Sequence, residues 1–154
     1  MLEKTVELLE QLPVFQGLSH QQLKAISDCG TKAFFQTGET IIAEGLPGDT
    51  AYVILTGKAG CPVREGDDIF EEDLWPGTLI GELAMLVETV HPVTVTAKER
   101  VRALAISRGD FHAVMQADPS IAQHISEKLL VRLYGLAEQL RKVDEQLAAI
   151  EEAA

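Results

Sequence analysis

The chain has 154 residues, of which 46% are hydrophobic and 24% charged, and its net charge at pH 7 is −11. This length suits one domain with an appended element, and the acidic excess repels nucleic-acid phosphates and anionic lipid. We therefore expect no nucleic-acid partner. No apolar run reaches the ~18 residues of a membrane span, so we expect no membrane partner either. The N-terminus lacks the basic start and apolar stretch of a signal peptide, which predicts a cytoplasmic protein.

Two short helices are expected at the start of the chain. The first repeats an apolar residue near helical spacing, at Leu2, Val6, Leu9 and Leu12. Pro13 then stops the pattern. Ser19 and Gln22 have the spacing of a capping box at the start of the second helix, and Gly30 is expected to end that helix in a left-handed conformation.

Residues 32–106 have the texture of a β-structure. Short runs rich in Val, Ile and Phe are separated about every ten residues by turn signals such as Pro47-Gly48-Asp49 and Pro76-Gly77. Residues 51–55 and 93–97 alternate as strands do when one face is wet. The count of strands predicts an antiparallel jelly roll.

The pattern returns to helix after Ser107, which with Asp110 predicts another capped start. A long helix is expected from Pro119 onward, because proline is favoured in a first helical turn. We therefore divide the chain into a β-roll with N-terminal helices, residues 1–118, and a C-terminal helix, residues 119–154. Apolar residues in that helix follow alternating steps of four and three, the pattern of a dimerising coiled coil, at Leu129, Leu133, Leu136, Leu140, Val143, Leu147 and Ile150.

A helix that lies against its own β-roll would also need an apolar stripe. Such a helix prefers a stripe wider than two positions in seven, and a small barrel has no room to cover seven successive contacts. A homodimer through this helix is therefore the favoured interpretation. The flanking positions carry few charges that could pair, so salt bridges do not enforce the orientation of the two helices.

Several stretches together are specific for a known family. They are residues 12–19 (LPVFQGLS), 38–45 (GETIIAEG), 48–57 (GDTAYVILTG) and 81–84 (GELA). With the order of the expected elements, they resemble the cyclic-nucleotide-binding domain over roughly residues 12–140. The resemblance implies a mainly β fold, a double-stranded β-helix or jelly roll with N-terminal helices and a long C-terminal helix.

The resemblance also implies a phosphate-binding cassette at Gly81, Glu82, Leu83 and Ala84. In this family the backbone N–H groups of a short helix face the cyclic phosphate, and a glutamate accepts a hydrogen bond from the ribose 2′-hydroxyl. Glu82 matches that glutamate. The alternative role of Glu82 is a structural one, as an acidic residue that interacts with a helix N-terminus.

The rest of the implied motif departs from the family. His91 stands where the family has the arginine that grips the phosphate, Pro92 where it has a small or hydroxyl residue, and Val93 where it has an alanine. Losing a charged bidentate contact costs on the order of 1.5–3 kcal/mol, and Pro92 also removes a backbone donor. A protonated His91 would replace part of the contact at mildly acid pH, whereas the alternative is a solvated histidine at a strand edge.

In relatives of the catabolite activator protein, the long helix carries a basic residue near the ligand and hydroxyls that read adenine. The resemblance places Arg132 in the first role, able to pair with Glu82, and puts Leu136 and Ala137 where the hydroxyls would be. Those relatives continue into a helix-turn-helix, which residues 1–154 do not contain. The sequence therefore resembles a sensor without its output domain.

Two functions remain open. The first is a regulatory sensor that binds cAMP, cGMP or a related small anion weakly at Gly81–Ala84, His91–Val93, Arg132 and Leu136, and signals through a dimeric helix. The second is a dimeric module that binds no nucleotide and engages a protein partner. We expect no enzyme, cofactor or metal site, because the sequence lacks metal-ligand spacing, a nucleophile elbow and a Walker lysine.

Overall fold

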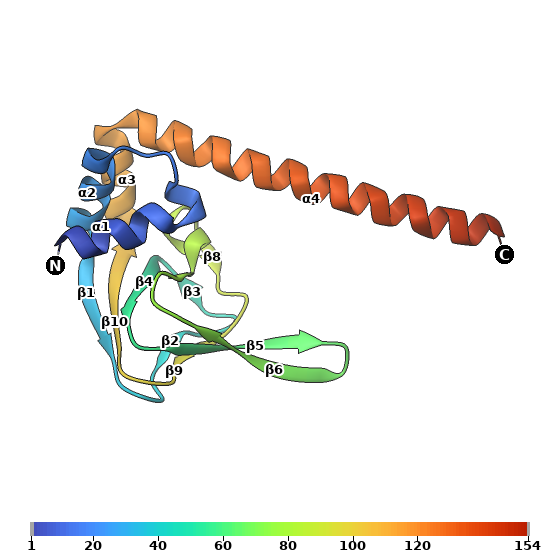
Figure 1. The fold of residues 1–154 in the computed structure, drawn as a ribbon, viewed down its shortest axis with the longest axis horizontal. Coiled ribbons are helices and arrows are strands. Elements are labelled where there is room, and N and C mark those ends of the chain that lie inside the picture. The colour runs from blue at the N-terminus through green and yellow to red at the C-terminus, as the bar shows by residue number, and fades with distance from the viewer. Residues whose placement is uncertain (1, 154) are drawn as a thin grey trace.

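The computed structural model describes residues 2–153 and confirms a mainly β fold with flanking helices (Figure 1). Its helices are α1 (Leu2–Gln11), η1 (Pro13–Phe15), α2 (His20–Cys29), η2 (Glu82–Met85), α3 (Arg108–Ala117) and α4 (Pro119–Ala153), where η marks a 3-10 helix. Its strands are β1 (Thr31–Phe35), β2 (Thr40–Ile42), β3 (Pro47–Gly48), β4 (Thr50–Thr56), β5 (Ala59–Glu65), β6 (Asp68–Leu74), β7 (Leu79–Ile80), β8 (Thr89–Val90), β9 (Val95–Ala97) and β10 (Val101–Ser107).

The strands form two four-stranded sheets and one short pair. The orders are β1-β10-β4-β7 and β2-β9-β5-β6, with β3 paired to β8, and the pairs are antiparallel. Ile54 of β4 packs toward the second sheet, in one cluster with Val95, whereas Val53 belongs to a cluster with the helices. The first sheet is therefore buried on both faces, by the second sheet and by the helical layer.

This arrangement corrects one expectation from the sequence. Residues 51–55 alternate as if one face were wet, but Ala51, Val53 and Ile54 are all 0% exposed. The helices cover the face that the pattern left to solvent, with Phe15 and Phe111 stacked edge to face at 6.0 Å in the same cluster. Alternation alone does not distinguish a solvated face from one buried under a separate layer.

The capping box of α2 is confirmed, because the Ser19 side chain accepts from the Gln22 N–H and the Gln22 side chain accepts from the Ser19 N–H. The prediction for Gly30 is wrong. Gly30 has φ −81° and ψ 162°, an extended conformation, and a Cβ at this position would lie 2.6 Å from the Leu104 side chain. Glycine is therefore needed here for the close approach of α2 to β10 and not for a left-handed turn.

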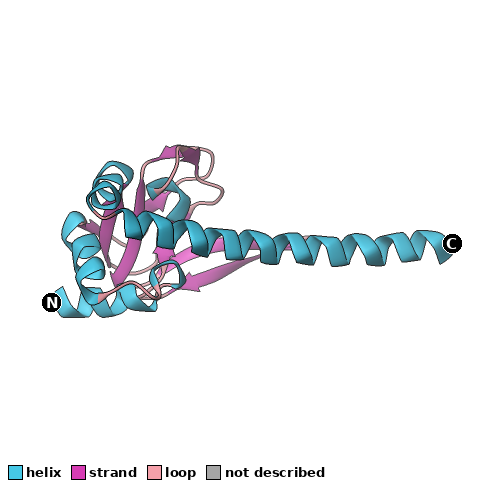
Figure 2. Ribbon diagram, turned by 90° about the horizontal axis from the view of Figure 1, so that it is seen from above, coloured by secondary structure: helices cyan, strands magenta, loops and turns pink. Residues whose placement is uncertain are grey.

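The helix α4 has a docked part and a projecting part. Ile121 and Ile125 are buried in the same core cluster as the other helices, and Leu129 packs partly against it. Beyond this point α4 runs away from the body, in the direction in which the β5–β6 hairpin also extends (Figure 1 and Figure 2). The helix therefore does not lie along its own β-roll. Within residues 2–153, no helix has the length and apolar character needed to cross a bilayer.

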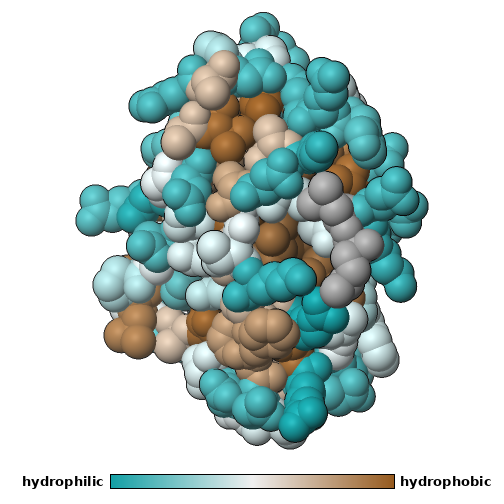
Figure 3. All heavy atoms as spheres, turned by 90° about the vertical axis from the view of Figure 1, so that its left-hand side faces the viewer, coloured by the Kyte–Doolittle hydropathy of each residue, from teal (hydrophilic) through white to brown (hydrophobic). Residues whose placement is uncertain are grey.

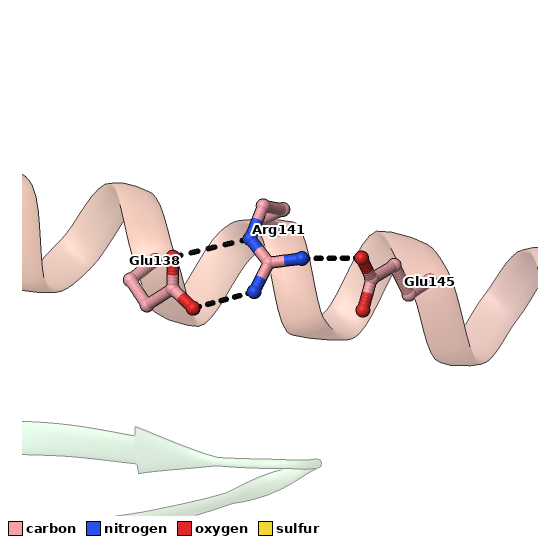
Figure 4. A network of polar contacts seen from close by, with 3 residues as sticks. All are labelled: Glu138, Arg141 and Glu145. Atoms are coloured by element: carbon pink, nitrogen blue, oxygen red, sulfur yellow. Dashed lines mark hydrogen bonds and ion pairs between the residues drawn. The ribbon is translucent and has the colours of Figure 1, made fainter.

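The apolar seam on the projecting part is uncovered. Its side chains are between 52% and 70% exposed, at Leu133, Leu136, Leu140, Val143, Leu147 and Ile150. Arg141 bonds Glu138 through its Nε, at 3.1 Å, and through Nη2, at 2.5 Å, and it also pairs with Glu145 (Figure 4). In the heptad register these three residues occupy outer positions, so their network stiffens the helix and leaves the seam free.

Candidate functional site

The chain enters the cassette through a left-handed turn at Gly81. Its φ of +73° and ψ of +36° lie in the region that favours glycine, and an added Cβ would also lie 3.4 Å from the Thr50 carbonyl oxygen. The turn leads into η2, where Ala84 and Met85 are buried and Leu83 is 54% exposed. The cassette is thus anchored by one side and presents the other to solvent.

Glu82 and Arg132 connect the cassette to α4. Arg132 donates to both carboxylate oxygens of Glu82: Nη1 lies 3.4 Å from Oε2, and Nη2 pairs with Oε1. The Glu82 side chain is 23% exposed and that of Arg132 is 52% exposed. This confirms that the two residues can pair, which the sequence predicted, although they are 50 positions apart. Arg132 lies just beyond the docked part of α4, so the ion pair joins the cassette to the start of the projecting part.

His91 fills the space between two glycines. It is 7% exposed, and a Cβ on Gly48 would lie 2.0 Å from its Nε2, while one on Gly81 would lie 3.5 Å from its Cε1. The backbone is fixed as well, since the His91 N–H donates to the Leu46 carbonyl and the His91 carbonyl accepts from the Gly45 N–H, at 3.0 and 2.9 Å. The alternative of a solvated edge histidine is therefore wrong: the ring lies beside the cassette.

The other expected site residues differ from Gly81, Glu82, His91 and Arg132 in their surroundings. Pro92 is exposed, and Val93 packs partly against the cluster between the two sheets. Leu136 is 58% exposed, one helical turn beyond Arg132. The structure thus brings together Gly81, Glu82, His91 and Arg132, whereas it gives Pro92, Val93 and Leu136 no polar role.

Some features of the site carried no signal in the sequence. Gly48 accommodates the His91 ring, a role that depends on a residue 43 positions away. The Arg108 N–H donates to the Asp49 carbonyl at 2.6 Å, and its Nη1 is buried without a hydrogen-bond partner among the described residues. His112 Nε2 lies 2.8 Å from the Leu86 carbonyl oxygen, which fixes the end of η2 to α3. These contacts join segments whose proximity only the fold determines.

Tyr52 adds a neutral polar group on the face of β4 toward the second sheet. Burial, with a smaller contribution from Asp49, raises the pKa of its hydroxyl, and its ring packs edge to face on Phe35 at 5.5 Å. Tyr52 pairs with Ile80, the residue before Gly81. The phenol therefore stays protonated at neutral pH. Within residues 2–153, no group of three or more His, Cys, Asp or Glu side chains is arranged to hold a metal ion.

Comparison with known proteins identifies the class of domain that has this fold. A profile described as the cyclic nucleotide-binding domain matches residues 32–118. The chain therefore belongs to the cyclic nucleotide-binding domain family. 

The relatives are regulators by name. The chain is 27% identical over 144 residues to the CRP-like cAMP-activated global transcriptional regulator of Mycobacterium tuberculosis, covering 92% of this chain and 61% of that protein. It is 32% identical over 108 residues to the cAMP-dependent protein kinase regulatory subunit of Schizosaccharomyces pombe, covering 70% and 26%. The N-terminal domain of a transcriptional regulator from Streptomyces coelicolor A3(2) superposes with a TM-score of 0.79 at 26% identity, covering 86% of this chain and 94% of that one.

Proposed function

We propose that this protein is a regulatory sensor domain that binds a cyclic nucleotide, cAMP or cGMP, weakly at the cassette and signals through a dimeric α4. The observation that carries the proposal is the ion pair between Glu82 and Arg132, which connects the cassette to the helix that would assemble. The names of the relatives support a regulatory role. A cytoplasmic location and the absence of catalysis are parts of the proposal itself.

The proposed binding step uses groups already in place. The first N–H groups of η2 have no partner within that short turn and would meet the cyclic phosphate, as Gly81 lets the backbone approach. Glu82 would accept a hydrogen bond from the ribose hydroxyl. Arg132 would give up part of its contact with Glu82 and turn to the negative charge that the ligand adds. A ligand shifts an equilibrium only by its difference in affinity for two states, so this exchange at Arg132 is the step that would move α4.

His91 sets the expected strength of binding. Where the family has the guanidinium fork of an arginine, His91 offers a ring with one donor when neutral and two when protonated. This difference is expected to weaken binding about ten- to a hundredfold. A charged ring beside the phosphate would restore part of that loss, so binding is expected to be tighter at pH 6 than at pH 8.

A second function is favoured by the same residue. Because His91 occupies the space between Gly48 and Gly81, the cassette would serve as a surface for a protein partner. Large apolar side chains near the cassette are more than half exposed, at Leu46, Leu83, Val87 and Val90. An exposed apolar patch of this kind is typical of interaction sites.

Calorimetric titration with cAMP and with cGMP at pH 6 and pH 8 separates the two functions. The sensor predicts saturable binding that is tighter at pH 6, and a His91→Arg variant that binds about ten- to a hundredfold more tightly with little dependence on pH. His20→Arg, at the exposed start of α2, adds the same charge elsewhere and should leave binding unchanged. Absence of binding at millimolar nucleotide in all three proteins would favour the interaction module.

A further inference from the structure

A cavity of about 730 Å³ lies apart from the cassette, between α1, the end of α2 and the face of the first sheet that the helices cover. None of the cassette residues lines it. Figure 3 shows the left-hand side of the view in Figure 1, where hydrophobic side chains are visible between hydrophilic ones. The volume of the cavity is within the range of about 300–1,000 Å³ that is usual for small-molecule sites.

The floor of the cavity is apolar. Leu8 of α1, Leu55 of β4 and Leu104 of β10 line it together. Leu104 belongs to the helical core cluster and Leu55 packs against it, so packing holds both side chains in place. The floor is therefore a preformed surface that an alkyl chain would remove from water.

Ser27 supplies a polar group inside this apolar setting. It is 6% exposed and lines the cavity. A serine hydroxyl has one O–H donor and two acceptor lone pairs, so it offers a ligand in the cavity a polar contact. Ser27 and His91 are the two buried polar residues among those described, and His91 belongs to the cassette.

The rim of the cavity is cationic. Lys4, Lys32 and Arg102 line it against one carboxylate, Glu7, in a chain whose net charge is −11. None of these three cations takes part in an ion pair with the residues described, and Arg102 lies 5.9 Å from the centre of the Phe34 ring. Three unpaired cations around an apolar floor complement a molecule with one anionic end and one alkyl end.

We propose that this cavity binds a free medium-chain fatty acid. The alkyl chain lies on Leu8, Leu55 and Leu104, the carboxylate meets Lys32 and Arg102 at the rim, and Ser27 donates a hydrogen bond. The site is separate from the cassette and would give the protein a second input, so it does not depend on the proposed nucleotide binding.

Calorimetric titration of the full chain with dodecanoate below its micelle concentration tests the proposal, with dodecanol and dodecyltrimethylammonium as ligands of matched chain length. Saturable binding of one dodecanoate is expected, with weaker binding of the alcohol and none of the ammonium. Lys32→Gln and Arg102→Gln should each weaken dodecanoate binding about tenfold. Ser27→Ala should weaken it by less, and Leu8→Gln should abolish it without disturbing the core cluster, to which Leu8 does not belong.

Lys24→Gln is the matched control, since Lys24 is exposed on α2 and does not line the cavity. Its affinity should equal that of the unchanged protein. Equal affinity for the three head groups, unchanged binding in the Lys32→Gln Arg102→Gln double variant, or no binding of dodecanoate would each overturn the proposal. Binding to anionic vesicles without binding of free dodecanoate would also overturn it, in favour of a membrane surface.

Discussion

The two parts of α4 carry the same kind of apolar side chain in very different surroundings. Ile121 is 0% and Ile125 3% exposed, whereas Leu140 is 70% and Ile150 64% exposed. The first part completes the core of its own chain, and the second has no surface of that chain to cover it. The difference teaches that one helix serves folding at its start and, as we propose, assembly at its end, with Arg132 between the two.

The largest effect should come from placing a charge in the exposed seam. Leu140→Asp puts a carboxylate at a core position of the proposed coiled coil, where it would be buried without a partner. We expect a dimer to become a monomer in sedimentation equilibrium. Ala149→Asp introduces the same residue at an outer position and should remain dimeric. A monomeric unchanged protein at micromolar concentration would instead remove the assembly proposal.

Shortening a buried side chain in the docked part of α4 tests whether that part belongs to the core. Ile125→Ala removes a buried side chain, so the free energy of unfolding should fall by about 2–5 kcal/mol, with no dependence on protein concentration beyond that of the unchanged protein. Leu140→Ala should lower it mainly by weakening association, which makes its effect depend on concentration. Denaturant unfolding at two protein concentrations measures both. If the two variants behaved alike, α4 would not be divided as we describe.

The ion pair between Glu82 and Arg132, at the junction of the two parts, should contribute less to the free energy of unfolding. Glu82→Gln removes one charge from a partly exposed ion pair, which costs about 0.2–1 kcal/mol of stability. Thermal unfolding should therefore change little, whereas cAMP affinity should fall because, in the proposed function, Glu82 also accepts a hydrogen bond from the ribose hydroxyl. Glu145→Gln, in the outer network of α4, should have a similar effect on stability and none on cAMP. A loss of cAMP affinity in both variants would contradict the role of Glu82.

The smallest effect concerns a thiol in the body. Burial, followed by the charges of Asp110 and Asp28, raises the pKa of Cys29 to about 11. A raised pKa leaves little reactive thiolate at pH 8, so alkylation of Cys29 should be slow and should speed up as pH rises toward 11. Leu140→Asp should not change this rate, whereas Ile125→Ala should raise it by loosening the body. Rapid labelling of Cys29 at pH 8 in the unchanged protein would show that the body is open there.

The sequence predicted those parts of the fold that depend on local pattern. The capping box at Ser19, the strands after residue 31 and the start of α4 at Pro119 follow from neighbouring residues. The extended Gly30 and the second buried face of β4 did not, because each depends on an element packed from elsewhere. Local pattern sets the elements, while their covering layers come from long-range contacts.

The candidate site shows the same division. The pairing of Arg132 with Glu82 was predictable because a family resemblance gave both residues a place in the fold. The burial of His91 against Gly48 was not, since no spacing in the sequence indicates that these two residues meet. The seam of α4 was visible as a heptad pattern, and its exposure from Leu133 onward is information that only the structure provides.

The central claim is that the exposed part of α4 pairs with a second copy in a geometry coupled to the cassette. Disulfide trapping of Leu140→Cys, with Cys29→Ala and Cys61→Ser, tests it most directly, because equivalent core positions face each other in a parallel pair. We predict rapid cross-linking at Leu140→Cys, a rate that changes when cAMP is added, and little cross-linking at the outer position Glu145→Cys. Equal rates at the two positions, unaffected by cAMP, would contradict the account.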